Sequence, residues 1–95
     1  MELEWDPGKA EENLRKHGVG FGEAATVFAD PLEVTIPDPG HSEGEARFLS
    51  VRLSGDARLL VVAYTEREGT IRIIHSRVAA PKERRAYESG QKSKD

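Results

Sequence analysis

The chain of 95 residues contains no cysteine, which excludes disulfide bonds, thiol catalysis and cysteine-based zinc sites. Its three histidines, His17, His41 and His75, lack the spacing of metal ligands, and its glycines form no phosphate-binding loop motif. No run of apolar residues approaches the length of a membrane span. We therefore expect no metal and no other cofactor. The acidic start of the chain shows no signal-peptide pattern, which predicts a cytoplasmic location.

The chain lacks an excess of positive charge, because its 17 Asp and Glu residues outnumber its 14 Lys and Arg residues and leave a net charge of -3. The charge is unevenly placed. Residues 1–45 hold three basic and eleven acidic residues, a net charge of -8, whereas residues 46–95 hold eleven basic and six acidic residues, a net charge of +5. Such asymmetry indicates either a polyanionic partner or an attraction between the two halves within the fold.

The length predicts one small domain, with residues 1–90 folded and residues 91–95 forming a frayed polar tail. Alternating apolar residues predict five strands, at residues 2–5, 32–36, 47–53, 59–64 and 71–78. Helix patterns predict three helices, at residues 7–17, 21–29 and 82–90. This order predicts an α+β fold in which a small antiparallel meander carries the first two helices on one face. The opposite face is then available for function.

The ends and faces of the first two helices follow from particular residues. Asp6-Pro7 predicts the start of the first helix and Gly18 its end. Apolar spacing predicts the inward-facing positions, which are Ala10, Leu14 and His17 in the first helix and Phe21, Ala24, Ala25 and Phe28 in the second.

The stretch from Glu66 to Tyr87 is the most informative part of the chain. It carries six basic residues within a strand pattern and a helix start: Arg67, Arg72, Arg77, Lys82, Arg84 and Arg85. Guanidinium groups held by a sheet suit a phosphate backbone, because each offers a planar fork of donors that stays charged. The same spacing also fits a solvated face with ordinary ion pairs.

The alternation of the strands separates these arginines. Arg47 shares the phase of Leu49, Val51 and Leu53, and Arg77 shares that of Ile71, Ile73 and His75, whereas Arg72 points the other way beside Ile74 and Ser76. We therefore expect Arg47 and Arg77 at the margin of an apolar face, where partial desolvation strengthens their action on a phosphate. The alternative is an ion pair with a carboxylate such as Glu45 or Glu83.

The remaining candidates each have an ordinary structural interpretation. His17 at a helix end interacts with the helix terminus or acts on phosphate. His75 in a strand is expected to be packed, and Trp5, Tyr64 and Tyr87 are expected in the core rather than stacked on bases.

RNA cleavage needs neither metal nor thiol, because the 2′-hydroxyl is an internal nucleophile. A protein that orients it, moves protons and stabilises the phosphorane charge with Arg or Lys can perform this reaction.

Over residues 3–88 the chain resembles the BrnT family of type II toxin–antitoxin toxins. The matching segments are E-W-D-P (4–7) with K-A (9–10), N-L-R-K-H-G-V (13–19), F-x-E-A-A-x-V-F-x-D-P (21–31), H-S-x-G-E-x-R-F (41–48), T-E-R-x-G-x-I-R-I-I-x-x-R (65–77) and E-R-R-x-Y-E (83–88). One departure is His75-Ser76-Arg77, where the family more often reads Ser-Ala-Arg.

The resemblance implies a RelE-like fold and a ribonuclease that arrests translation. It also implies a partner, a BrnA-type ribbon-helix-helix antitoxin, which forms a hetero-oligomer with the toxin and carries it to promoter DNA. A non-catalytic co-repressor with the same fold and antitoxin interface is the alternative.

By position, the resemblance implies two sets of site residues. The expected catalytic set is Arg67, Arg77, Arg84, Glu66 and His17, with Arg67, Arg77 and Arg84 on the phosphate. The expected RNA-binding set is Lys16, Arg47 and Arg72, and Glu45 and Glu83 are further candidates for proton transfer or orientation.

Overall fold

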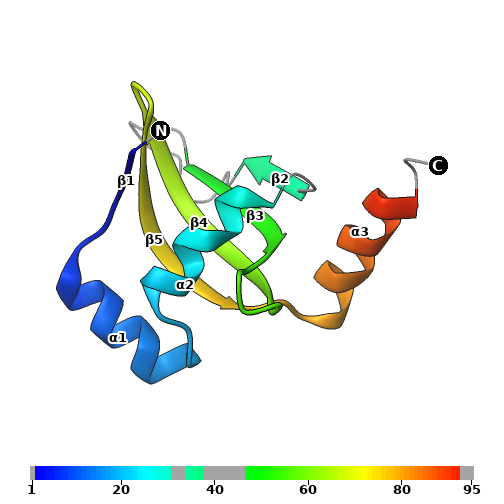
Figure 1. Cartoon of the computed structure of the whole chain (residues 1–95), viewed down its shortest axis with the longest axis horizontal. Helices are drawn as coiled ribbons and strands as arrows, with labels where there is room; N and C mark the ends of the chain where they lie inside the picture. The colour runs from blue at the N-terminus through cyan, green and yellow to red at the C-terminus, as the bar shows by residue number, and fades with distance from the viewer. Residues whose placement is uncertain (1, 31–33, 38–46, 93–95) are drawn as a thin grey trace.

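A computed structural model describes residues 2–30, 34–37 and 47–92 of the chain. Within these residues, helices and strands follow one another in the predicted order (Figure 1). The elements are β1 (Glu2–Glu4), α1 (Pro7–His17), α2 (Phe21–Thr26), the 3-10 turn η1 (Val27–Ala29), β2 (Val34–Pro37), β3 (Arg47–Leu53), β4 (Leu59–Arg67), β5 (Thr70–Val78) and α3 (Pro81–Lys92).

The five strands form one sheet in the order β1-β5-β4-β3-β2. Strands β2 to β5 are the predicted antiparallel meander, and β1 adds a parallel edge strand beside β5, so the sheet is mixed. The β4–β5 turn places Glu68 and Gly69 at φ values of 51° and 83°, the pair of left-handed residues that a two-residue type I′ hairpin requires. The predicted α+β class is confirmed.

Several boundaries differ from the prediction. Strand β4 extends to Arg67 instead of ending at Tyr64, because it pairs with β5 as far as the hairpin turn. Helix α3 continues to Lys92, so the first two residues of the predicted frayed tail are helical and residues 93–95 lie outside the described residues. The prediction that strand β2 begins at Leu32 also concerns a residue outside the described ranges.

The predicted ends of α1 are confirmed, but its predicted inner face is partly wrong. The Asp6 carboxylate accepts a hydrogen bond from the Lys9 backbone N–H at 2.9 Å, and Gly18 ends the helix at a φ of 69°. Leu14, however, is 54% exposed, and the buried residue of this helix is Asn13. The helix is therefore turned so that a polar side chain, rather than the leucine, meets the sheet.

Asn13 is buried because it replaces a missing strand at the edge of β5. Its amide Nδ2 donates to the Ser76 carbonyl and to the Val19 carbonyl, each at 2.8 Å, while its Oδ1 accepts from the Ser76 N–H at 3.1 Å. The side chain thus satisfies both backbone groups of one residue in β5, beyond the point where β1 ends. It fixes α1 against this strand.

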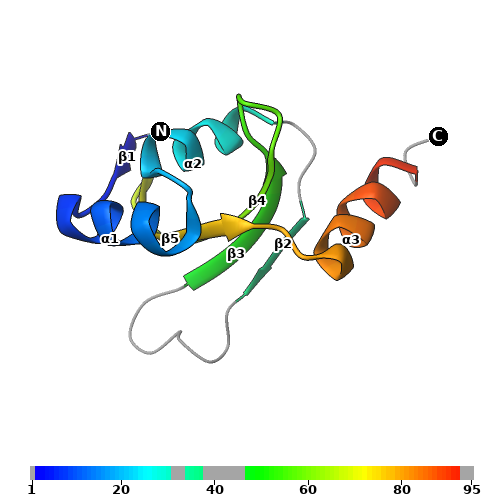
Figure 2. The ribbon, with the colours of Figure 1, turned by 90° about the horizontal axis from the view of Figure 1, so that it is seen from below.

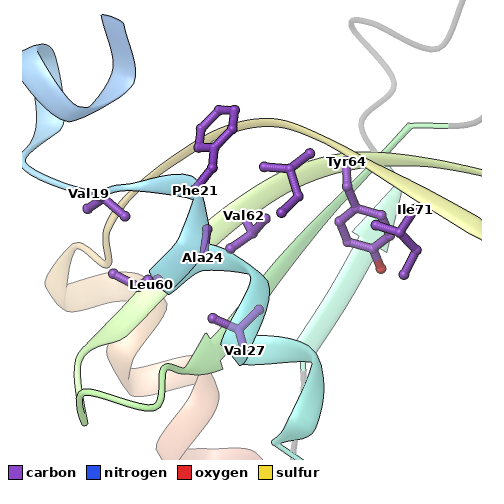
Figure 3. Packing of buried hydrophobic residues seen from close by; sticks show 9 residues of the cluster. Val19, Phe21, Ala24, Val27, Leu60, Val62, Tyr64 and Ile71 are labelled. Atoms are coloured by element: carbon purple, nitrogen blue, oxygen red, sulfur yellow. The ribbon is translucent and has the colours of Figure 1, made fainter. Parts of the chain in front are cut away.

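The main core lies between the sheet and the first two helices. Figure 3 shows its side chains converging from α2, β4 and β5, and its buried members are Val19, Phe21, Ala24, Val27, Leu60, Val62, Tyr64, Ile71 and Ile73. Trp5 meets Phe21 edge to face, and Phe28 meets Tyr64 in the same way. The predicted core roles of Trp5 and Tyr64 are confirmed. We call this side of the sheet the helix-covered face.

The opposite side, which we call the open face, is covered by α3 at one end only (Figure 2). Tyr87 is the anchor: its ring packs against Val51, Leu59 and Val61, and its hydroxyl donates to Asp30 Oδ2 at 2.7 Å. A core role for Tyr87 is thus confirmed. The rest of the open face, toward the β4–β5 turn, carries polar and charged residues.

A partly exposed ion pair between Glu23 and Arg58 ties the start of α2 to the β3–β4 hairpin. Arg58 donates to both carboxylate oxygens of Glu23, at 2.9 and 2.5 Å, and also to the Gly18 carbonyl at 3.0 Å. The Ser54 hydroxyl donates to Glu23 at 2.8 Å. The hydrogen bond from Arg58, and then that from Ser54, lowers the pKa of the Glu23 carboxyl below its ordinary value of 4.5 against the opposing effect of burial.

This pair predicts a loss of stability in acid. A carboxyl whose pKa is lower in the folded state stabilises the fold above its unfolded pKa, and the contribution disappears as pH falls through the folded pKa. We expect the free energy of unfolding to decrease progressively below pH 4.5. In Glu23→Gln, which cannot titrate, the decrease should be shallower and stability at neutral pH lower. Urea unfolding between pH 3 and pH 7 measures both, and identical pH profiles would contradict the prediction.

Candidate nucleic-acid interface

A β-bulge in β5 decides which side chains share the open face. Ala63 pairs with His75, but the next residue, Tyr64, pairs with Ile73, so Ile74 is the extra residue on β5. Ile71 and Ile73 therefore pack into the main core, whereas His75 and Arg77 lie opposite Ala63 and Val61 on the other side of the sheet.

The bulge corrects the predicted arrangement of the arginines. Strict alternation separates Arg72 from Arg77, but Arg72 pairs with Thr65, which lies on the open face, so Arg72, His75 and Arg77 all project from that face. Arg47 pairs with Thr65 from the other side, which places it in the same row as Arg72. The prediction that Arg47 and Arg77 are partly desolvated is confirmed, since both are half-buried.

Arg72 and the neighbouring Arg67 line an open hollow of about 500 Å³ beside the β4–β5 turn. We call it the arginine hollow, and its lining residues are Glu4, Thr65, Arg67, Glu68, Thr70 and Arg72. Arg72 donates to Glu4 at 2.9 Å, and both side chains are about half exposed, so solvent screens this pair strongly. The hollow thus offers two guanidinium groups and two hydroxyls to a phosphate, with Glu4 competing for one of the cations.

Arg77 lies farther along β5 and is held by the predicted alternative, an ion pair with Glu83. Its two terminal nitrogens donate to the two Glu83 oxygens at 2.8 and 2.6 Å. Glu83 also accepts from the Ala80 N–H at 2.8 Å, a bond that closes the first turn of α3. The hydrogen bond from Arg77 is the largest influence on Glu83 and lowers the pKa of that carboxyl. The main structural role of this ion pair is therefore to hold α3 against β5.

A second hollow, of about 250 Å³, lies where α1 meets β5. We call it the histidine hollow, and its lining residues are Lys9, Glu12, Asn13, Lys16, His17, Ile74 and His75. Lys16 and His17 come from the last turn of α1, and Lys16 forms an exposed ion pair with Glu12 at 3.3 Å. The structure therefore brings two sequence-predicted site residues together with a histidine that was expected to be merely packed.

Besides Arg77, two further predicted catalytic residues, Glu66 and Arg84, line neither hollow. Glu66 pairs with Ile71, so it projects toward the helix-covered side of the sheet, opposite to its neighbour Arg67. Arg84 is exposed on α3 and lines neither hollow. The structure thus separates Glu66 from Arg67, although the two are adjacent in the sequence, because successive side chains in a strand point to opposite faces. Glu45, the other predicted partner of Arg47, lies outside the described residues.

Sequence reasoning missed the positions of Thr65 and Thr70 in the arginine hollow and of His75 on the open face. The threonines are ordinary strand residues in the sequence, and only the register places their hydroxyls beside Arg67 and Arg72. His75 reaches the open face only through the bulge at Ile74, and no turn-forming residue in the sequence indicates that bulge.

Among the described residues, no three His, Asp or Glu side chains gather as a metal site. None of the helices in the described ranges is both long and apolar enough to span a membrane.

Comparison with known proteins identifies the fold and the family of the chain. The solved structure of the ribonuclease toxin BrnT from Brucella abortus superimposes with a TM-score of 0.65 at 18% sequence identity, covering 84% of this chain and 97% of that chain, which shows a shared fold. A search among curated proteins finds no match. The family model described as the ribonuclease toxin BrnT of type II toxin–antitoxin systems matches residues 5–83. This range includes every lining residue of the two hollows except Glu4. The chain therefore belongs to the BrnT family of ribonuclease toxins of type II toxin–antitoxin systems.

Proposed function

We propose that this toxin is a metal-independent endoribonuclease that cleaves RNA on the open face of its sheet and thereby inhibits translation in the cytoplasm. The observation that carries the proposal is the arginine hollow, where Arg67 and Arg72 stand beside the hydroxyls of Thr65 and Thr70. Arg47 extends the same row across the sheet. A single strand of RNA needs such an exposed cationic surface, because its phosphates supply much of the binding energy.

The chemistry asks little more of the protein than position and charge. The 2′-hydroxyl of the substrate is the nucleophile, so the protein has to align it with the phosphate, move protons and stabilise the charge that develops on the phosphorane oxygens. Cationic side chains beside the substrate provide that stabilisation. Arg67 and Arg72 are better placed than Arg77 to bind the phosphates of the strand, because Arg72 makes one exposed hydrogen bond to Glu4, whereas both terminal nitrogens of Arg77 are engaged by Glu83.

Membership of a type II toxin–antitoxin family implies an antitoxin partner. We propose that the partner is a BrnA-type ribbon-helix-helix protein that forms a hetero-oligomer with this chain and reaches promoter DNA on its behalf.

A second candidate function is a non-catalytic co-repressor that retains the fold and the antitoxin interface. The observation that favours it is the pairing of two open-face arginines with carboxylates, Arg72 with Glu4 and Arg77 with Glu83. Each of these ion pairs engages a guanidinium group that could otherwise bind a phosphate. The two candidates differ in one property only, the ability to cleave RNA.

RNA cleavage in the presence of EDTA tests the proposal. Purified, antitoxin-free protein is incubated with a mixed-sequence RNA, with and without ribosomes, and with EDTA or with added Mg²⁺. We expect cleavage at comparable rates with and without the chelator, and products that end in a 2′,3′-cyclic phosphate. Cleavage that EDTA abolishes would contradict metal independence. No cleavage under any condition, by a protein that still binds its antitoxin, would support the co-repressor.

A further inference from the structure

The histidine hollow is distinguished by two imidazoles that different elements bring together. His17 is the last residue of α1, and His75 belongs to the central part of β5. Both line the same hollow, with Lys16 beside them. His75 is half-buried and His17 is exposed, so the hollow has one anchored and one accessible imidazole.

Two structural features bring His17 and His75 to the same hollow. The bulge at Ile74 turns His75 onto the open face, on the same side of the sheet as Arg72 and Arg77. Asn13, which also lines the hollow, holds the adjacent Ser76 through both of its backbone groups and so fixes α1 against β5. The strand that presents His75 and the helix that presents His17 are therefore clamped together by buried hydrogen bonds.

The charges that surround the hollow favour an anion. From α1 come Lys9, Lys16 and Glu12, and the last of these is paired with Lys16 at 3.3 Å. From β5, the neighbours of His75 on the open face are Arg72 and Arg77, each paired with one carboxylate, Glu4 of β1 and Glu83 of α3. From β4, the residue opposite His75 is the uncharged Ala63.

We propose that His17 and His75 are catalytic residues that exchange protons with the substrate during RNA cleavage, with Lys16 on the scissile phosphate and Arg67 and Arg72 on other phosphates of the same strand; this rests on the proposed ribonuclease function. One imidazole takes the proton of the 2′-hydroxyl, and the 2′-oxygen attacks phosphorus. A P–O2′ bond forms while the P–O5′ bond breaks. The other histidine, as imidazolium, gives its proton to the departing 5′-oxygen. The products are a 2′,3′-cyclic phosphate and a 5′-hydroxyl, and no electrons are exchanged.

The pH dependence of RNA cleavage by the full-length protein tests the pair. We expect a bell-shaped profile of kcat/KM for the wild type. His75→Gln and His17→Gln should each lower kcat by about 100-fold to 10,000-fold and each remove one limb of the bell. Glu11→Gln, at an exposed position of α1 that lines neither hollow, is the control and should keep the wild-type profile. If His75→Gln cleaves at the wild-type rate, or loses rate equally at every pH with both limbs retained, the proposal is overturned.

A binding measurement separates failure of the pair from failure of the ribonuclease function. The imidazole signals of the wild-type protein are followed by NMR while cytidine 3′-monophosphate is added. We expect the signals of both His17 and His75 to shift. Unchanged signals in a protein that cleaves RNA would overturn the hollow as the site while leaving the ribonuclease function intact. Absence of cleavage would overturn both.

Discussion

Replacing Arg67 and Arg72 together by alanine is expected to lower kcat/KM for RNA cleavage by about 100-fold to 10,000-fold while the protein stays folded. Each guanidinium contact with a phosphate is a charge-assisted hydrogen bond worth about 1.5–3 kcal/mol, and every 1.4 kcal/mol corresponds to a factor of about ten. Both side chains are exposed, and the Glu4 pair that Arg72 loses is a screened surface pair, so stability should change by less than about 1 kcal/mol.

The matched control is Lys82→Ala/Arg85→Ala, which removes the same amount of charge from exposed positions on α3. We expect this variant to retain most of the activity, because α3 lies at the other end of the open face. Circular dichroism and the thermal midpoint establish that all three proteins are folded. If the Arg67/Arg72 variant cleaves like the wild type while the α3 variant loses activity, RNA binds near α3 and the arginine hollow is not the site.

Asn13→Ala is expected to lower the free energy of unfolding by about 3 kcal/mol, a large fraction of the stability of a small domain. The substitution removes three buried hydrogen bonds and leaves the Ser76 N–H, the Ser76 carbonyl and the Val19 carbonyl without the partner that Asn13 provides. Each buried polar group left in this way costs about 1–3 kcal/mol. Urea denaturation measures the change, with Glu11→Ala, an exposed residue of the same helix, as the control.

Asn13→Asp distinguishes lost hydrogen bonds from lost packing. Aspartate fills the same volume but cannot donate to the two carbonyls, and its charge would face both of them. We expect it to destabilise the protein at least as much as alanine does. An Asn13→Asp variant as stable as the wild type would show that packing, not hydrogen bonding, holds α1 against β5. Because the same contacts place His17 near His75, we also expect both variants to cleave RNA more slowly.

The parts of the fold that could be predicted are those set by local chemistry. Asp6 and Gly18 mark the ends of α1 through their own backbone and side-chain preferences. The spacing of Phe21, Ala24 and Phe28 defines a stripe that packs on the sheet. These signals lie within a few residues of what they determine, and each was confirmed.

The parts that could not be predicted depend on contacts between distant segments. Leu14 is the more hydrophobic choice for the inner face of α1, yet Asn13 takes that position because the edge of β5 needs hydrogen-bond partners. The bulge at Ile74 arises where β4 and β5 change register, and it moves His75 and Arg77 to the face that Arg72 occupies, which strict alternation does not predict. The pairing of Arg77 with Glu83 was foreseen as an alternative, but only the geometry decides it.

NMR mapping of an RNA that cannot be cleaved tests most directly whether RNA binds the open face. A short oligonucleotide with 2′-O-methyl groups lacks the nucleophile, so it stays intact on the wild-type protein. We predict changes in the backbone amide signals of residues 65–72 and 75–77 and of the end of α1, with the signals of α2 unchanged. Changes confined to α2 or to α3, with the signals of β4 and β5 unaltered, would contradict an RNA site on the open face.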